Sequence, residues 1–101
     1  MKRHLIRYKI KPEQADENER LVKAVFQELA EKAPDGVRYM TLRAGDGTFV
    51  HLVETETDAH ADLITGLAAF EAFQNGFRDR CIERPQREEM TVVGSYRMLD
   101  R

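Results

Sequence analysis

The chain has 101 residues, with 16 basic against 18 acidic side chains and a single cysteine. This length predicts one domain over residues 1–101 with one core. The balanced charge argues against a broad electrostatic contact with nucleic acid or an anionic membrane. Cys81 has no partner for an internal disulfide, and neither a signal peptide nor an apolar run of about 20 residues is present, so we expect a cytoplasmic protein.

The first predicted element is a strand over residues 4–10. Its side chains alternate, with Ile6, Tyr8 and Ile10 on one side, which is typical of a strand with one buried face. Pro12 follows shortly after and cannot donate to a ladder, so the strand ends before it.

A helix is expected next, because apolar residues recur every three or four positions over residues 21–33. Asp16 and Glu19 have the spacing of a capping box at its start. The Pro-Asp-Gly sequence at residues 34–36 ends the helix and turns the chain.

Residues 37–43 and 48–55 read as two strands joined by the turn Gly45-Asp46-Gly47, which predicts a β-hairpin. We expect one side of the hairpin to carry Met40, Leu42, Val50 and Leu52. The opposite side then carries Tyr39, Thr41, Arg43, Phe49, His51 and Val53.

The last part of the chain predicts a second helical segment and a fourth strand. Thr57 or Asp58 caps the helical segment. A straight helix over residues 59–82 would be about 36 Å long, so we expect a break near Gly66-Leu67. Residues 78–89 are dense in charge and Pro85 ends the segment, so they are expected to form a helix end and a loop. Residues 90–99 alternate and are expected to form the fourth strand.

This order of elements predicts an α+β protein, a ferredoxin-like βαββαβ sandwich with a four-stranded antiparallel sheet. Both helical segments would cover one face and leave the other bare. An open face of this size indicates a partner, and a second copy would close the two sheets around a cavity, giving a homodimeric α/β barrel. The expected bare face carries Leu5, Arg7, Lys9, Tyr39, Thr41, Arg43, Phe49, His51, Val53, Thr91, Val93, Ser95 and Arg97.

Several segments resemble the antibiotic-biosynthesis-monooxygenase-like family of the dimeric α/β-barrel superfamily. They are residues 7–12 (RYKIKP), 69–74 (AFEAFQ), Arg80-Cys81, Pro85 and 93–97 (VGSYR). The resemblance implies a homodimer and includes oxygenases of aromatic compounds that need no cofactor, as well as haem-degrading enzymes. Active branches use tryptophan, asparagine and tyrosine or histidine in the pocket. This chain has no tryptophan, and its two asparagines, Asn18 and Asn75, lie on predicted helices.

Two functional hypotheses follow. In the first, an aromatic or enolisable compound lies between the sheets, His51 takes a proton, and Arg7 or Arg97 holds the developing anion, without metal or flavin. Tyr39, Thr41 and Ser95 would donate hydrogen bonds to the ligand. In the second, a dimer of the same fold binds a small molecule or serves a regulatory or stress role without catalysis.

Each candidate residue also has a purely structural interpretation. His51 could be satisfied by a neighbouring strand, and the arginines could pair with acids at a dimer rim. Cys81 follows a helix C-terminus, which disfavours a thiolate, so we interpret it as a packing residue. The histidines lack metal-ligand spacing, so no metal site is expected. Nucleic-acid binding is disfavoured because the third strand, around Phe49, lacks the basic residue and paired aromatics of an RNA-recognition motif.

Overall fold

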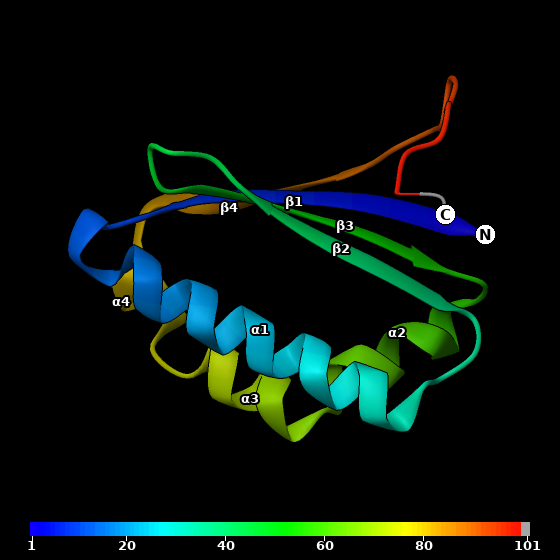
Figure 1. Ribbon diagram of the computed structural model, residues 1–101, viewed down its shortest axis with the longest axis horizontal. Coiled ribbons are helices and arrows are strands. Elements are labelled where there is room, and N and C mark those ends of the chain that lie inside the picture. Colours follow the sequence, from blue (N-terminus) through cyan, green and yellow to red (C-terminus); the bar gives the residue numbers. More distant parts are fainter. Residues whose placement is uncertain (100–101) are drawn as a thin grey trace.

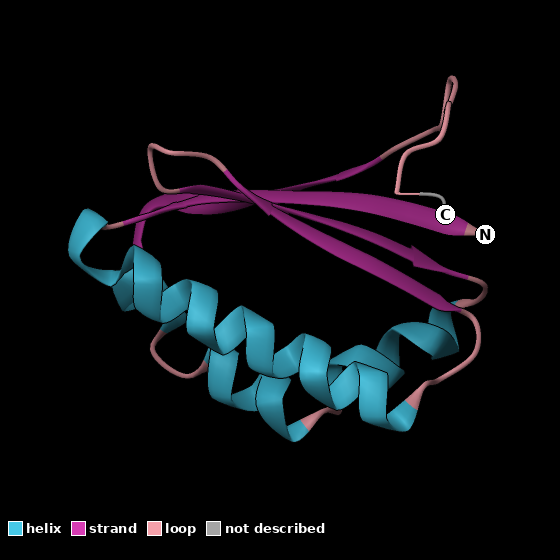
Figure 2. Ribbon diagram, viewed as in Figure 1, coloured by secondary structure: helices cyan, strands magenta, loops and turns pink. Residues whose placement is uncertain are grey.

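A computed structural model describes residues 1–99 (Figure 1). A sheet and a helical layer pack face to face, and all helices lie on one side of the sheet (Figure 2). The strand order is β2-β3-β1-β4, with each neighbouring pair antiparallel. The predicted ferredoxin-like βαββαβ fold is confirmed. The elements are β1 (Lys2–Ile10), η1 (Pro12–Gln14), α1 (Ala15–Lys32), β2 (Val37–Arg43), β3 (Thr48–Thr55), α2 (Asp58–Thr65), α3 (Ala68–Gln74), α4 (Phe77–Arg80) and β4 (Cys81–Glu89).

The core lies between the sheet and α1 with α3. Tyr8 and Ile10 of β1 face it, as their alternation predicts. Phe49 and His51 of β3 also face it, because Tyr8 lies opposite Phe49 and Ile6 opposite His51 in the sheet. The prediction that these two residues lie on the bare face is therefore wrong. Both sides of β3 carry apolar residues, so alternation alone does not decide which side is buried. The side with Phe49 faces the core because its aromatic ring offers more apolar surface to bury.

The helix-free face of the sheet carries the other set of hairpin residues. Leu5 lies opposite Leu52, Met40 is also opposite Leu52, and Leu42 is opposite Val50. These five side chains are partly or largely exposed, and Leu42 is 51% exposed. The helix-free face is thus more apolar than predicted, because the polar hairpin residues Tyr39 and Thr41 turn toward the helices.

The predicted fourth strand is wrong in position. β4 pairs with β1 from Ile10 opposite Cys81 to His4 opposite Glu89, so it occupies residues expected to form a loop. The pairing shifts register between Arg7 and Lys9, beside Pro85. Proline is tolerated there because β4 is an edge strand with an irregularity at that point. Residues 90–99 have no strand pairing in the described chain, and Figure 1 shows them leaving the sheet.

The helical layer follows most of the predicted boundaries. The expected break near Gly66-Leu67 is confirmed, since α2 ends at Thr65 and α3 begins at Ala68. The Thr57 cap is confirmed as a capping box with His60. None of the helices in the described part of the chain is long and apolar enough to cross a membrane.

The predicted capping box of the first helix is wrong. α1 begins after Gln14, without a side-chain cap. The carboxylates of Asp16 and Glu19 instead accept hydrogen bonds from Nη1 of Arg43, at 3.0 and 2.9 Å. These bonds tie the start of α1 to the end of β2.

Candidate functional site

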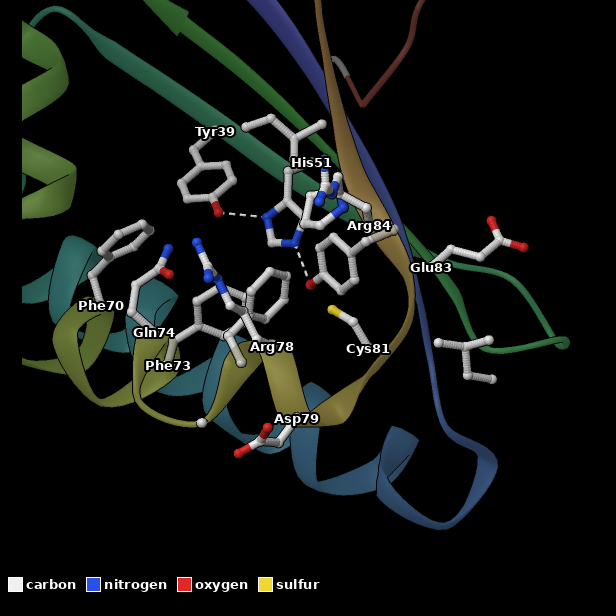
Figure 3. A pocket seen from close by; sticks show the side chains of 16 residues that line it. Tyr39, His51, Phe70, Phe73, Gln74, Arg78, Asp79, Cys81, Glu83 and Arg84 are labelled. Atoms are coloured by element: carbon white, nitrogen blue, oxygen red, sulfur yellow. Dashed lines mark hydrogen bonds between the residues drawn. The ribbon is translucent and has the colours of Figure 1, made fainter.

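A groove opens between the helix-facing side of the sheet and the segment that runs from α3 into β4. Its volume is about 1100 Å³, and aromatic side chains line its inner part (Figure 3). Polar and charged side chains gather where α4 and β4 border it. The lining residues are Ile6, Tyr8, Tyr39, His51, Phe70, Phe73, Gln74, Gly76, Phe77, Arg78, Asp79, Cys81, Ile82, Glu83, Arg84 and Pro85.

His51 forms the inner end of the groove, where central strand β3 places it under the helices. Its Nε2 is 2.7 Å from the Tyr8 hydroxyl, and its Nδ1 is 2.5 Å from the Tyr39 hydroxyl and 3.1 Å from Thr41 Oγ1 (Figure 3). Only 3% of the residue is exposed. Burial lowers the pKa of His51 to about 4, so the imidazole is neutral at pH 7.

The hydrogen-bonded chain continues from His51 into the core. Asn18 of α1, which is fully buried, donates from Nδ2 to the Tyr8 hydroxyl at 3.0 Å. Arg80 Nε donates to Asn18 Oδ1 at 3.1 Å. The chain therefore joins α1, β1, β3 and the end of α4 through side chains alone.

Arg80 is a buried cation whose hydrogen bonds all go to uncharged oxygens. Nη1 donates to the carbonyl of Asn75 at 3.0 Å and Nη2 to the carbonyl of Phe73 at 2.6 Å. The guanidinium also lies over the rings of Phe73 and Phe77, 5.4 and 5.6 Å from their centroids. Burial lowers the pKa of Arg80, but guanidinium remains charged at neutral pH. The α3–α4 turn is thus held around a fixed positive charge.

Tyr8 and Tyr39, the two tyrosines that hydrogen-bond His51, keep their protons at neutral pH. Burial raises the pKa of Tyr39 to about 12, and it raises the pKa of Tyr8 as well. The neighbouring Thr41 hydroxyl lowers the pKa of Tyr39, but this effect is smaller than that of burial. The inner end of the groove is therefore uncharged and rich in hydroxyl groups.

Sequence reasoning placed only part of this site. Tyr39, Thr41 and His51 do meet, although on the helix side of the sheet. Arg7 lies next to Ile6 in β1 and therefore points to the helix-free side of the sheet, so the prediction that Arg7 and His51 share one face is wrong. Ser95 and Arg97 lie in the exposed segment after β4, so their predicted position on a cavity strand is wrong too.

Three residues of this hydrogen-bonded chain are not among the predicted site residues: Tyr8, Asn18 and Arg80. The sequence did contain a signal for one of them. Asn18 precedes Val22 and Val25 at helical spacing, and a polar residue in line with an apolar stripe needs a buried partner. Arg80 gave no such signal, because the charged stretch around it is otherwise exposed.

Cys81 borders the groove between α4 and β4. It is half-buried, and burial raises the pKa of its thiol, which is consistent with the predicted packing role. Within residues 1–99, no three His, Cys, Asp or Glu side chains gather closely enough to hold a metal ion.

No family model matches the chain, and no curated protein matches it. Solved structures do. A protein of Nitrosomonas europaea, provisionally named an antibiotic biosynthesis monooxygenase, superposes with a TM-score of 0.75 at 15% identity, covering 93% of this chain and all of its own. A similarly named protein of Bacteriodes thetaiotaomicron gives a TM-score of 0.77 at 17% identity, covering 91% of this chain and 89% of its own.

A third such protein, from Caulobacter crescentus, has a TM-score of 0.75 at 18% identity and covers 92% of this chain and 90% of its own. The chain thus has the ferredoxin-like fold of the antibiotic biosynthesis monooxygenase proteins, which confirms the resemblance at the level of fold. At these identities the likeness concerns the backbone, and the chemistry has to be argued from the groove.

Proposed function

We propose that the protein binds a small planar aromatic compound in the groove between the sheet and α3–α4, and oxygenates it without a cofactor. The observation that supports this is an aromatic-walled groove that ends at a neutral His51–Tyr39 pair. The names of the proteins with the same fold point to the same reaction class.

The groove suits a flat, hydrophobic ligand. The ring centroids of Phe70 and Phe73 in α3 are 5.9 Å apart, and the centroid of Phe77 in α4 is 5.1 Å from that of Phe73. Three aromatic rings therefore line one wall of the groove. Ring faces and edges at such spacings pack well against another aromatic ring. Polar groups at the inner end, beyond these rings, would orient such a ligand.

The proposed reaction begins with a hydroxylated aromatic ring that binds as its anion. Its ring carbon reacts with dioxygen; one oxygen atom stays as a new carbonyl and the other leaves as water. A hydroxyarene and O₂ thus give a quinone and H₂O, with all four electrons supplied by the substrate. Tyr39 would hydrogen-bond the anionic oxygen, and His51 would hold Tyr39 in position. A direct base role for His51 would require it to release one of its two tyrosine partners.

Oxygen uptake with a series of hydroxynaphthalenes tests the reaction. We expect protein-dependent uptake of one O₂ per quinone formed, reduced at least tenfold in Tyr39→Phe. Tyr96→Phe is the matched control, because Tyr96 is exposed in the segment after β4. Uptake no faster than autoxidation in buffer, or equal in wild type and Tyr39→Phe, would refute the proposal.

A second candidate is a binding protein without catalysis. It is favoured by His51, whose two nitrogens are both engaged and whose pKa is far below 7. Calorimetric binding of an aromatic ligand that is lost in a groove variant such as Phe73→Ala, without any oxygen uptake, would identify this case.

We also propose that two copies pair through the helix-free face of the sheet. Leu5, Met40, Leu42, Val50 and Leu52 give it an apolar surface that a monomer would leave in water. Residues 90–99 have the alternation of a strand and no partner strand in the described chain, and a second copy would supply one. Light scattering should give a dimer, and Leu52→Lys should shift it toward monomer; a monomeric wild type at micromolar concentration would contradict the pairing.

A further inference from the structure

We infer that Arg80 and Asn18 set the direction of the hydrogen bonds that run to Tyr39, so that the groove offers its ligand an O–H donor. The ligand class that follows, resting on the proposed aromatic groove, is a planar ring system with a carbonyl or anionic oxygen. Arg80 and Asn18 are positioning residues in this scheme, since both act through Tyr8 and His51.

The direction is fixed first at Asn18. A guanidinium has only donors, so Arg80 Nε at 3.1 Å requires the amide oxygen of Asn18 as its acceptor. The amide nitrogen must then face Tyr8, and it can only donate to the hydroxyl oxygen 3.0 Å away. The orientation of this buried amide therefore follows from the chemistry of its neighbour.

The second step is at Tyr8. Its oxygen already accepts from Asn18, and 3% of the residue is exposed. Within residues 1–99 its other side-chain partner is His51 Nε2, at 2.7 Å. If Nε2 carried a proton, two donors would point at the Tyr8 oxygen, and the hydroxyl hydrogen would be buried without an acceptor. The Tyr8 hydroxyl therefore donates to Nε2.

The third step is across the imidazole. A neutral histidine has one N–H, so it lies on Nδ1 when Nε2 accepts. Nδ1–H donates to the Tyr39 oxygen at 2.5 Å, the shorter of its two contacts, since Thr41 Oγ1 lies 3.1 Å from Nδ1. The O–H of Tyr39 is then free to point into the groove, which Tyr39 lines. A ligand that supplies an acceptor completes the chain, whereas a ligand that supplies only a donor opposes it.

The tautomer of His51 can be measured without any ligand, by ¹⁵N–¹H correlation across the labelled imidazole. We expect Nδ1–H in the wild type. Asn18→Asp should change the tautomer to Nε2–H. The new carboxylate still accepts the hydrogen bond from Arg80, and it now also accepts one from the Tyr8 hydroxyl. Gln27→Glu is the matched control, an exposed amide-to-acid change on the same helix, and should leave the tautomer unchanged. Nε2–H in the wild type, or no change in Asn18→Asp, would overturn the direction.

Three tricyclic probes of nearly the same shape test the ligand class. Fluorenone carries a carbonyl, carbazole an N–H, and fluorene neither. We expect wild type to bind fluorenone at least fivefold more tightly than carbazole, with fluorene between them, and Asn18→Asp to reverse the order. Carbazole binding as tightly as fluorenone in the wild type would overturn the ligand class. If none of the three binds, the proposed aromatic groove and the ligand class fail together, while the tautomer measurement still decides the direction.

Discussion

Tyr8 and His51 are 43 residues apart in the chain, yet the Tyr8 hydroxyl lies 2.7 Å from His51 Nε2. They are diagonal neighbours on the helix-facing side of β1 and β3, since Tyr8 pairs with Phe49 and His51 with Ile6. The contact joins the hydrophobic core to the groove. Tyr8 belongs to the core through its ring, and His51 reaches the groove through Tyr39. Packing in the core and polarity in the groove are therefore coupled.

Tyr8→Phe should reduce the free energy of unfolding by about 1–3 kcal/mol, although the ring stays in the core. The reason is that Asn18 Nδ2 and His51 Nε2 would both lose their buried partner. Urea unfolding measures the change. Tyr96→Phe removes an exposed hydroxyl and should change stability by less than about 0.5 kcal/mol. Equal stability of wild type and Tyr8→Phe would mean that water takes over both bonds.

Stability should fall as the pH drops toward 4, and His51 should account for part of the fall. Its pKa is about 4 in the folded state against an ordinary value of 6.5. The unfolded chain therefore binds the proton first, so this contribution is fully present above about pH 6.5 and is lost as the pH falls to about 4. The difference in pKa corresponds to about 3 kcal/mol.

Urea unfolding of wild type and His51→Gln at pH 4 and 7 isolates this term, because the carboxylates common to both cancel. The wild type should lose more stability between the two pH values than the variant does. Equal losses would indicate that His51 is not desolvated in the folded protein.

The sequence was enough to predict the fold because its signals were local and repeated. Alternation in residues 4–10, the Gly-Asp-Gly turn and the apolar spacing in residues 21–33 each specify one element, and the order of elements leaves few topologies. The position of β4 could not be predicted in this way. Residues 81–89 contain Pro85 and many charges, and they form a strand only because β1 offers an unpaired edge.

The site was less predictable, because its parts meet only through the tertiary fold. His51, Tyr39 and Thr41 could be grouped from strand alternation, but alternation does not say which side of the hairpin faces the helices. Arg80 and Asn18 are 62 residues apart, and neither has a neighbour in sequence that suggests the other. Buried polar networks are built from long-range contacts of this kind.

Gly36→Ala should be destabilising by about 1–2 kcal/mol or more, for two reasons that act together. Gly36 has a φ of +79°, a backbone conformation that residues with a side chain rarely adopt. An added Cβ would also lie 2.3 Å from Cδ2 of the His60 ring. Moving that ring would break the capping box with Thr57 at the start of α2. Thermal unfolding measures the loss. Gly45→Ala is the control, since no atom beyond its two chain neighbours lies within 4 Å of the new Cβ; a loss as large there would remove His60 from the explanation.

Arg80→Met should destabilise the protein by about 3 kcal/mol, although methionine fits the length of the arginine stem and tolerates the apolar surroundings. The change removes donors from Asn18 Oδ1 and from the carbonyls of Asn75 and Phe73, all on one guanidinium. Arg80→Lys should restore only part of the loss, because an ammonium cannot reproduce the planar fork that reaches three acceptors.

The matched control is Arg78→Met, an exposed position on the same helix, which should change stability little. Chemical denaturation compares the three variants with wild type. If Arg80→Lys were as stable as wild type, the positive charge alone would hold the α3–α4 turn. If Arg80→Met were as stable as wild type, the carbonyls of that turn would be satisfied by water, and the turn could form without the buried cation.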